Sequence, residues 1–128
     1  MNKAIIDASA LLALIKEEPG AEIVEGLLGK IIMSSVNVSE VAGSLMTPEL
    51  SIEECQRCIL PFISSLASFD EEQAFKAASL KEATRTKGLS LGDRACIALG
   101  ITMQLPIYTA DRIWDKLDLE NADIRLIR

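Results

Sequence analysis

Acidic residues at four points of the chain have the types and placement needed for metal chemistry. Asp7, Glu40 and Asp111 each lie near a junction where an apolar, strand-like run gives way to a helix-like one, and Asp93 lies in the first turn of an apolar helix. Carboxylate oxygens suit hard divalent cations such as Mg²⁺ and Mn²⁺. Two such ions activate a water and stabilise the leaving oxygen of a phosphodiester. Four acids that meet would therefore be the ligands of a metal-dependent hydrolase.

The composition narrows the chemistry further, because the 128 residues include no histidine. This excludes Ser-His-Asp and Cys-His nucleophilic machinery, imidazole acid–base catalysis and histidine-bound metals. If the protein is an enzyme, its catalytic groups would then be carboxylates, assisted by Arg, Lys, Ser or Thr. The net charge of −6 argues against a protein that coats nucleic acid through a general basic field, although it permits a basic rim around an acidic pocket.

Hydroxyl residues accompany two of the acids. Ser9 lies two residues after Asp7, and Thr109 lies two residues before Asp111. We expect these hydroxyls to hydrogen-bond the carboxylates or a metal-bound water. Helix capping explains them equally well.

Charged residues next to the acids supply candidate contacts to a substrate. Arg94 and Arg112 each directly follow a candidate acid, and Asp115 lies about one turn after Asp111. The arginines are candidate phosphate contacts, and Asp115 is a possible additional acid. The alternative for all three is a solvated surface charge.

Helix capping is the competing explanation for the acids themselves. Acids are favoured in the first turn of any helix, and both Ser90–Asp93 and Asn37–Glu40 have capping-box spacing. For each acid taken singly, capping is the better explanation. Several like charges in one crevice repel, however, unless a cation or protonation compensates them. Taken together, the four acids favour a metal site.

Strands and helices alternate along the chain. The predicted strands are 3–6, 31–36, 66–69, 106–109 and 123–127. The predicted helices are 8–15, 21–28, 37–46, 51–65 with a break at Pro61, 70–85, 89–104 and 110–117. This order predicts a single α/β domain over residues 1–128, with a mainly parallel five-stranded sheet and helices on both faces.

Such a sheet would bring the acids together. Parallel strands end at the same edge of a sheet, and ligands bind outside that carboxyl edge. Asp7, Glu40 and Asp111 lie at or just after predicted strand ends. The helix that carries Asp93 leads through a short turn into strand 106–109, so it runs against the strands and begins at the same edge.

The remaining features indicate a cytoplasmic protein with free thiols. No apolar run approaches the roughly 20 residues that span a bilayer, and the N-terminus lacks a signal-peptide pattern. Cys55 and Cys58 form a C-x-x-C without the second pair or histidine that a zinc site needs. The capping box Ser51–Glu54 places Cys55 one turn inside a helix, so we expect structural thiols.

The motifs around the acids resemble those of PIN-domain proteins, and more closely VapC-type toxins of toxin–antitoxin pairs. The matching segments are 6–13 followed by Glu18-Pro19-Gly20, then 37–41, 89–99 and 105–114. They cover nearly the whole chain in the expected order, although 46–75 carries no usable signature. The resemblance implies a three-layer α/β/α sandwich with strand order 3-2-1-4-5.

The resemblance also implies an activity and partners. In that family Asp7, Glu40, Asp93 and Asp111 would form an acidic quartet that binds Mg²⁺ or Mn²⁺ and cleaves RNA. Homodimers are frequent, and a cognate antitoxin commonly places a basic side chain among the acids.

Two other functions are open alternatives. A phosphatase of the haloacid-dehalogenase type would have a second Asp two residues after Asp7, where this chain has Ser9. A phosphate-accepting receiver would have one strand-end Asp with Lys and Thr in a set order, which is not found. A non-catalytic PIN-like module that binds a partner protein would keep the same fold.

Overall fold

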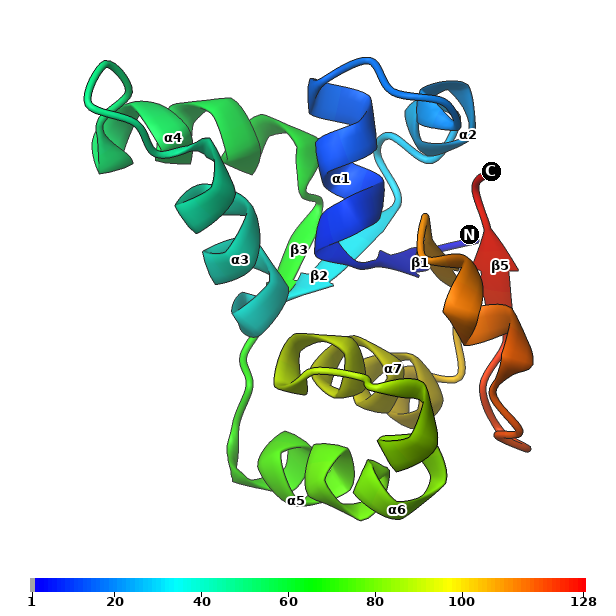
Figure 1. The fold of residues 1–128 in the computed structure, drawn as a ribbon. Coiled ribbons are helices and arrows are strands. Elements are labelled where there is room, and N and C mark those ends of the chain that lie inside the picture. The colour runs from blue at the N-terminus through cyan, green and yellow to red at the C-terminus, as the bar shows by residue number, and fades with distance from the viewer. Residues whose placement is uncertain (1) are drawn as a thin grey trace.

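The computed structural model describes residues 2–128, and its five strands form one parallel sheet (Figure 1). The strands lie in the order β3-β2-β1-β4-β5, and every neighbouring pair is parallel. Their bounds are β1 (Ala4–Ile6), β2 (Ile31–Ser34), β3 (Ser65–Ala67), β4 (Ile107–Thr109) and β5 (Ile124–Leu126). The expected α/β fold and its strand order 3-2-1-4-5 are confirmed.

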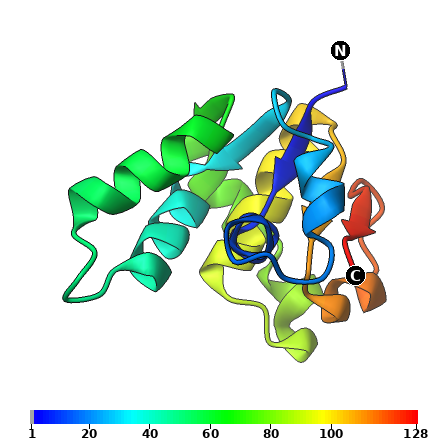
Figure 2. The ribbon, with the colours of Figure 1, turned by 90° about the horizontal axis from the view of Figure 1, so that it is seen from above.

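Helices cover both faces of the sheet. They are α1 (Ala8–Ile15), α2 (Ala21–Glu25), α3 (Ser35–Leu45), α4 (Ile52–Ile59), α5 (Glu71–Ser79), α6 (Lys81–Thr84) and α7 (Leu91–Met103). In Figure 1, α1 to α4 lie on one side of the sheet and α5 to α7 on the other. Figure 2 shows α3 and α4 side by side at one end of the molecule.

The two faces of the sheet support two separate cores. Successive side chains of a strand point to opposite faces, so Ile6 packs with α1 to α4 while Ile5 packs with α5 and α7. Helix α7 approaches β4 closely at Gly100, where an added Cβ would collide with the Ile107 side chain. This contact fixes the helix that carries Asp93 against the sheet. No helix within residues 2–128 is long and apolar enough to cross a membrane.

The start of α3 differs from the prediction. The strand ends at Ser34 and the helix begins at Ser35, because the Ser34 hydroxyl accepts a 3.2 Å hydrogen bond from the Val36 N–H. Asn37 therefore lies inside the helix, where it is 1% exposed, and does not cap it. The prediction that Asn37 is the N-cap was wrong by three residues.

Two predicted helices are shorter or interrupted. The predicted helix 110–117 is a 3₁₀ turn, Arg112–Lys116, which buries Trp114. The predicted helix 70–85 breaks at Leu80, where the buried Thr84 hydroxyl donates a 2.8 Å hydrogen bond to the Leu80 carbonyl. A side chain that bonds the preceding turn commonly bends a helix.

The segment around Pro61 follows the expected break. Helix α4 ends at Ile59, and a 3₁₀ turn, Leu60–Phe62, contains the proline. The capping box of Ser51 and Glu54 is present, with both hydrogen bonds formed. All three cysteines are free thiols, and Cys58 alone is exposed.

Candidate active site

Asp7 lies at the centre of the carboxyl edge, between β1 and α1. Its side chain is 4% exposed. Oδ1 accepts hydrogen bonds from the Ala10 N–H at 2.9 Å and the Ser9 hydroxyl at 2.8 Å. Oδ2 accepts one from the Thr109 hydroxyl at 2.6 Å. Asp7 therefore caps α1 and at the same time joins the end of β1 to the last residue of β4.

The environment of Asp7 opposes its negative charge. Burial raises the pKa of this carboxyl to about 6, although hydrogen bonds from Thr109, Ala10 and Ser9 favour the charged form. The charge of Asp93 adds to the rise in the pKa, so the two carboxylates lie close enough to repel. A cation at this position would relieve both effects.

Ser9 and Thr109 extend this network to Asp111. The Ser9 hydroxyl accepts a 2.9 Å hydrogen bond from the Ala110 N–H, and the Thr109 hydroxyl accepts one of 3.0 Å from the Asp111 N–H. The Asp111 carboxylate itself is exposed, and its Oδ1 caps the Ile113 N–H at 3.1 Å. Asp111 thus lies next to the site, with its carboxylate used as a cap.

Glu40 reaches the site through a contact between α3 and α7. The buried Asn37 amide donates to Glu40 Oε1 at 2.9 Å and to the Gly92 carbonyl at 3.0 Å. The Glu40 carboxylate lies against Gly92, where any Cβ would collide with it. The absence of a side chain at residue 92 therefore provides the space that Glu40 occupies. Asn37 Oδ1 is buried and has no hydrogen-bond partner in residues 2–128.

Asp93 forms the predicted capping box with Ser90. Asp93 Oδ2 accepts from the Ser90 N–H at 2.9 Å, and the Ser90 hydroxyl accepts from the Asp93 N–H at 3.3 Å. Cys96, one turn further along α7, is fully buried. Burial raises the pKa of the Cys96 thiol well above its usual range, and the charges of three acids add to the rise; these are Asp7, Asp93 and Glu40. The charges of the three acids therefore all act on one residue of α7.

The donor set suits a hard divalent cation, although three of its members, Asp7, Asp93 and Asp111, also serve as caps. Within residues 2–128, no three His, Cys, Asp or Glu side chains are arranged so that they could hold a metal ion. Asp93 and Asp111 accept hydrogen bonds from the N–H groups of Ser90 and Ile113. Rotation of these two side chains away from the N–H groups would free their carboxylate oxygens.

The other charged candidates lie at the margin. Arg112 donates through Nη1 to the Arg128 carbonyl at 2.9 Å, so its guanidinium is held at the C-terminal segment. Arg94 is half-buried, and its Nε has no partner in the part of the chain that the structure describes. Asp115 is exposed in the 3₁₀ turn, and no hydrogen bond among residues 2–128 joins it to Asp7.

Sequence reasoning missed three contributors to the site. Gly92 makes room for Glu40, Cys96 lies beneath the acids, and Asn37 joins Glu40 to α7. For Asn37 a signal existed, because positions three apart face the same side of a helix. The same spacing suggested a cap, so Glu40 was expected as the partner of Asn37 through backbone N–H groups, whereas the two side chains bond each other directly.

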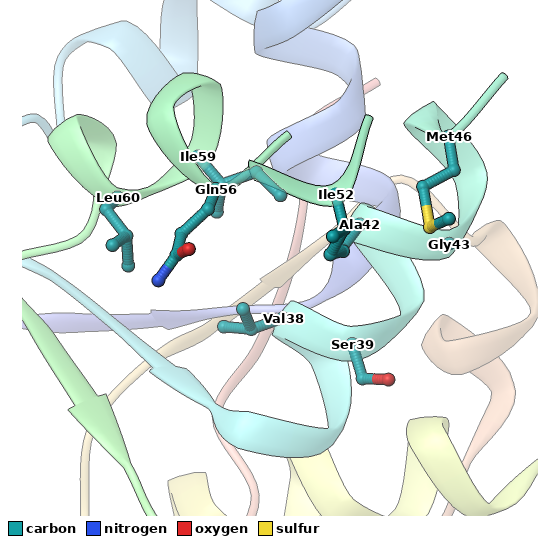
Figure 3. Close-up of a pocket in the computed structure, with 9 residues that line it drawn as sticks. All are labelled: Val38, Ser39, Ala42, Gly43, Met46, Ile52, Gln56, Ile59 and Leu60. Atoms are coloured by element: carbon teal, nitrogen blue, oxygen red, sulfur yellow. The ribbon is translucent and has the colours of Figure 1, made fainter. Parts of the chain in front are cut away.

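An apolar pocket lies beside this site, between α3 and α4 (Figure 3). Its volume is about 450 Å³. The residues that line it include Val38, Ala42, Met46, Ile52 and Leu60. Met46, Ile52 and Leu60 remain 49%, 48% and 44% exposed. Helix α3 thus presents Glu40 to the acidic site and an apolar surface to this pocket.

Comparison with protein families gives one match over most of the chain. The family model described as PIN domain matches residues 4–120. No curated protein matches the sequence significantly.

Solved structures with this fold include several toxin–antitoxin complexes. DNA-bound VapBC from Salmonella typhimurium is 16% identical, with all of both chains covered and a TM-score of 0.73. VapBC2 from Rickettsia felis, bound to a promoter DNA fragment, is 15% identical over 96% of this chain and 97% of that chain, with a TM-score of 0.72. VapBC-5 from Mycobacterium tuberculosis is 18% identical over 100% of this chain and 99% of that chain, with a TM-score of 0.64. At these identities the likeness shows a shared fold.

Proposed function

Because the chain belongs to the PIN-domain family, we propose that it is a metal-dependent endoribonuclease, and that it acts as the VapC-type toxin of a toxin–antitoxin pair. One observation carries this proposal: Asp7, Glu40 and Asp93 come from three separate elements and gather near the first turns of α7, where the Glu40 carboxylate lies against Gly92 and all three charges act on Cys96. Acids that served only as caps would have no need to share one location. The absence of histidine leaves carboxylates as the working groups.

Each acid would have a defined part in this activity. Asp7 is the fixed ligand, because three hydrogen bonds hold its two oxygens. Glu40 is positioned by Asn37, while Asp93 and Asp111 complete the set when they leave their caps. Mg²⁺ or Mn²⁺, when bound, would supply an activated water and stabilise the leaving oxygen of the phosphodiester. Ser9 and Thr109 orient Asp7 through hydrogen bonds to its two oxygens.

The proposed partner is an antitoxin that covers the acids and the apolar pocket together. The structural relatives include complexes described as VapBC and as toxin–antitoxin. A partner with an apolar helix face would fill the pocket between α3 and α4, and a following Arg or Lys would reach the acids. The proposal includes the homodimer and cytoplasmic location expected from the resemblance, which sedimentation and cell fractionation test.

A non-catalytic module is the second candidate, favoured by one observation. Asp93 and Asp111 both serve as helix caps, and a protein-binding scaffold would retain them in that role. Calorimetry with Mn²⁺ beside a cleavage assay separates the two candidates. Metal binding without cleavage of any RNA would favour the module.

The test of the nuclease is cleavage of total RNA by the purified chain. We expect cleavage with Mg²⁺ or Mn²⁺ and none with a chelator, and production of the chain alone should arrest growth. Mapping the cut ends would identify the RNA class. Cleavage that a chelator leaves undiminished would contradict the metal-dependent reaction.

A further inference from the structure

The edge of the sheet opposite the acids gathers positive charge. Ala4 and Ile31 are partners in the parallel register of β1 and β2, and the Ala4 N–H donates to the Lys30 carbonyl at 3.0 Å. Lys3 and Lys30 therefore lie side by side, one residue before the two strands begin. Strand β1 thus has a lysine at its amino end and Asp7 at its carboxyl end, about 13 Å apart at the usual rise per residue.

A pocket opens at this amino edge. Its volume is about 520 Å³, within the roughly 300–1,000 Å³ typical of small-ligand sites. Lys3, Lys30, Tyr108 and Arg125 give it polar walls. The apolar walls are Ala4, Leu27, Leu105 and Pro106. A ligand that fits both kinds of wall carries an anionic group together with a less polar body.

The two lysines supply the charge that is free to bind a ligand. Arg125 already forms a 2.9 Å ion pair with Asp123 and donates to the Tyr108 hydroxyl at 3.2 Å. Lys3 and Lys30 form no ion pair with any carboxylate within residues 2–128. The lysines elsewhere in residues 2–128 also form no ion pair, so what distinguishes Lys3 and Lys30 is their position side by side at one pocket.

We propose that this amino-edge pocket binds the phosphate of a nucleotide, either a free nucleotide or one within an RNA chain. An ammonium group is a compact charge with three rotatable donors, which suits the oxygens of a phosphate. Two ammonium groups from different loops close around one such group, and the apolar walls accept the sugar and base. The site is distinct from the acids, so it does not depend on the nuclease proposal.

The test is a titration of the ¹⁵N-labelled full chain, followed by NMR. The probes are adenosine monophosphate, inorganic phosphate and a short single-stranded RNA, the last on an Asp7→Asn background that prevents cleavage. We expect the amide signals of Lys3, Lys30 and Leu105 to shift. A shift with adenosine monophosphate shows that a free nucleotide is sufficient. A shift with RNA but not with adenosine monophosphate shows that the nucleotide must be part of an RNA strand.

Two double variants distinguish binding in this pocket from a general effect of the net charge. Combined Lys3→Gln and Lys30→Gln should weaken binding about tenfold or more, because two charge-assisted contacts are lost. Combined Lys76→Gln and Lys81→Gln, which change the net charge equally on α5 and α6, should leave it unchanged. The site would be overturned if no signals shift, or if the shifts persist in the Lys3→Gln, Lys30→Gln protein. If inorganic phosphate binds as tightly as the nucleotide, the assignment to a nucleotide would be overturned.

Two further measurements distinguish nucleotide binding in this pocket from an effect of the substitutions on folding and from the nuclease activity. Raising the salt concentration should weaken binding by the unaltered chain, since exposed charges are screened. At saturating concentrations of a short RNA, the maximal rate of cleavage should be unchanged in the Lys3→Gln, Lys30→Gln protein, because this pocket is lined by residues at the opposite edge of the sheet from the acids. A fall in that maximal rate without a loss of nucleotide binding would count against a separate site.

Discussion

The Thr109 hydroxyl donates a 2.6 Å hydrogen bond to Asp7 Oδ2 and accepts a 3.0 Å hydrogen bond from the Asp111 N–H. One side chain thereby connects acids from the ends of two neighbouring strands. Thr109 is 0% exposed, so no water replaces either partner. The geometry of the acidic site depends on this buried hydroxyl.

Thr109→Val should therefore destabilise the fold and raise the pKa of Asp7 further. The substitution keeps the shape but leaves Asp7 Oδ2 and the Asp111 N–H without the hydroxyl that they bond, at a cost of about 1–3 kcal/mol. Urea denaturation measures the loss. Thr109→Ser, which keeps the hydroxyl, should recover most of the stability. Full stability in Thr109→Val together with a loss in Thr109→Ser would show that the methyl group matters instead of the hydrogen bonds.

The buried charge of Asp7 predicts an unusual dependence of stability on pH. Burial raises the pKa of this carboxyl from 3.8 to about 6, so between these values the folded chain keeps a proton that the unfolded chain has lost. Stability from Asp7 is therefore present below pH 3.8 and is lost as the pH rises through about 6. The shift corresponds to roughly 3 kcal/mol at most.

Asp7→Asn tests this dependence. In metal-free buffer its free energy of unfolding should exceed that of the original chain by an amount that grows as the pH rises from about 4 to 7. Asp115→Asn, at an exposed carboxyl, is the control and should follow the original profile. Parallel profiles for Asp7→Asn and the original chain would mean that the carboxyl is not enclosed as the structure places it.

Gly92→Ala should impair the site although alanine favours helices. The added Cβ would meet the Glu40 carboxylate and displace it. We expect RNA cleavage and Mn²⁺ affinity to fall about tenfold or more, in line with changes to metal-orienting contacts. Gly43→Ala is the matched control, because this helical glycine has open space around it. That variant should gain about 0.5–1 kcal/mol of stability and keep its activity.

Asn37→Ala should uncouple Glu40 from α7. The variant loses hydrogen bonds to Glu40 and to the Gly92 carbonyl, both near 3 Å. We expect about 1–3 kcal/mol less stability and a fall in cleavage of about tenfold. Ser39→Ala, at an exposed position of the same helix, should change neither quantity. Unchanged cleavage by Asn37→Ala would show that the asparagine supports the fold alone.

The sequence pattern predicted the architecture well because short apolar segments, typical of buried strands, alternate along the chain with segments that have helical periodicity. Ile5 and Ile6 are both buried, as expected for a parallel sheet covered on two faces. The direction of α7 followed from its short connection to β4. Both capping boxes, at Ser51 and Ser90, formed as their spacing indicated.

Local hydrogen bonds and one tertiary contact determined what the pattern missed. Asn37 and Glu40 have the spacing of a cap, but their position inside α3 was decided by Ser34, which caps the helix three residues earlier. The break at Leu80 depends on a hydrogen bond from the buried Thr84. The role of Gly92 rests on a contact with another helix, which local spacing does not encode.

Cleavage of total RNA by single variants of the acids tests the central claim most directly. Asp7→Asn and Asp93→Asn should each lower the rate in Mg²⁺ or Mn²⁺ by about a hundredfold or more, while circular dichroism shows an intact fold. Asp115→Asn should cleave as the original chain does. Full activity in both Asp7→Asn and Asp93→Asn would contradict a shared catalytic role for the acids at the carboxyl edge of the sheet.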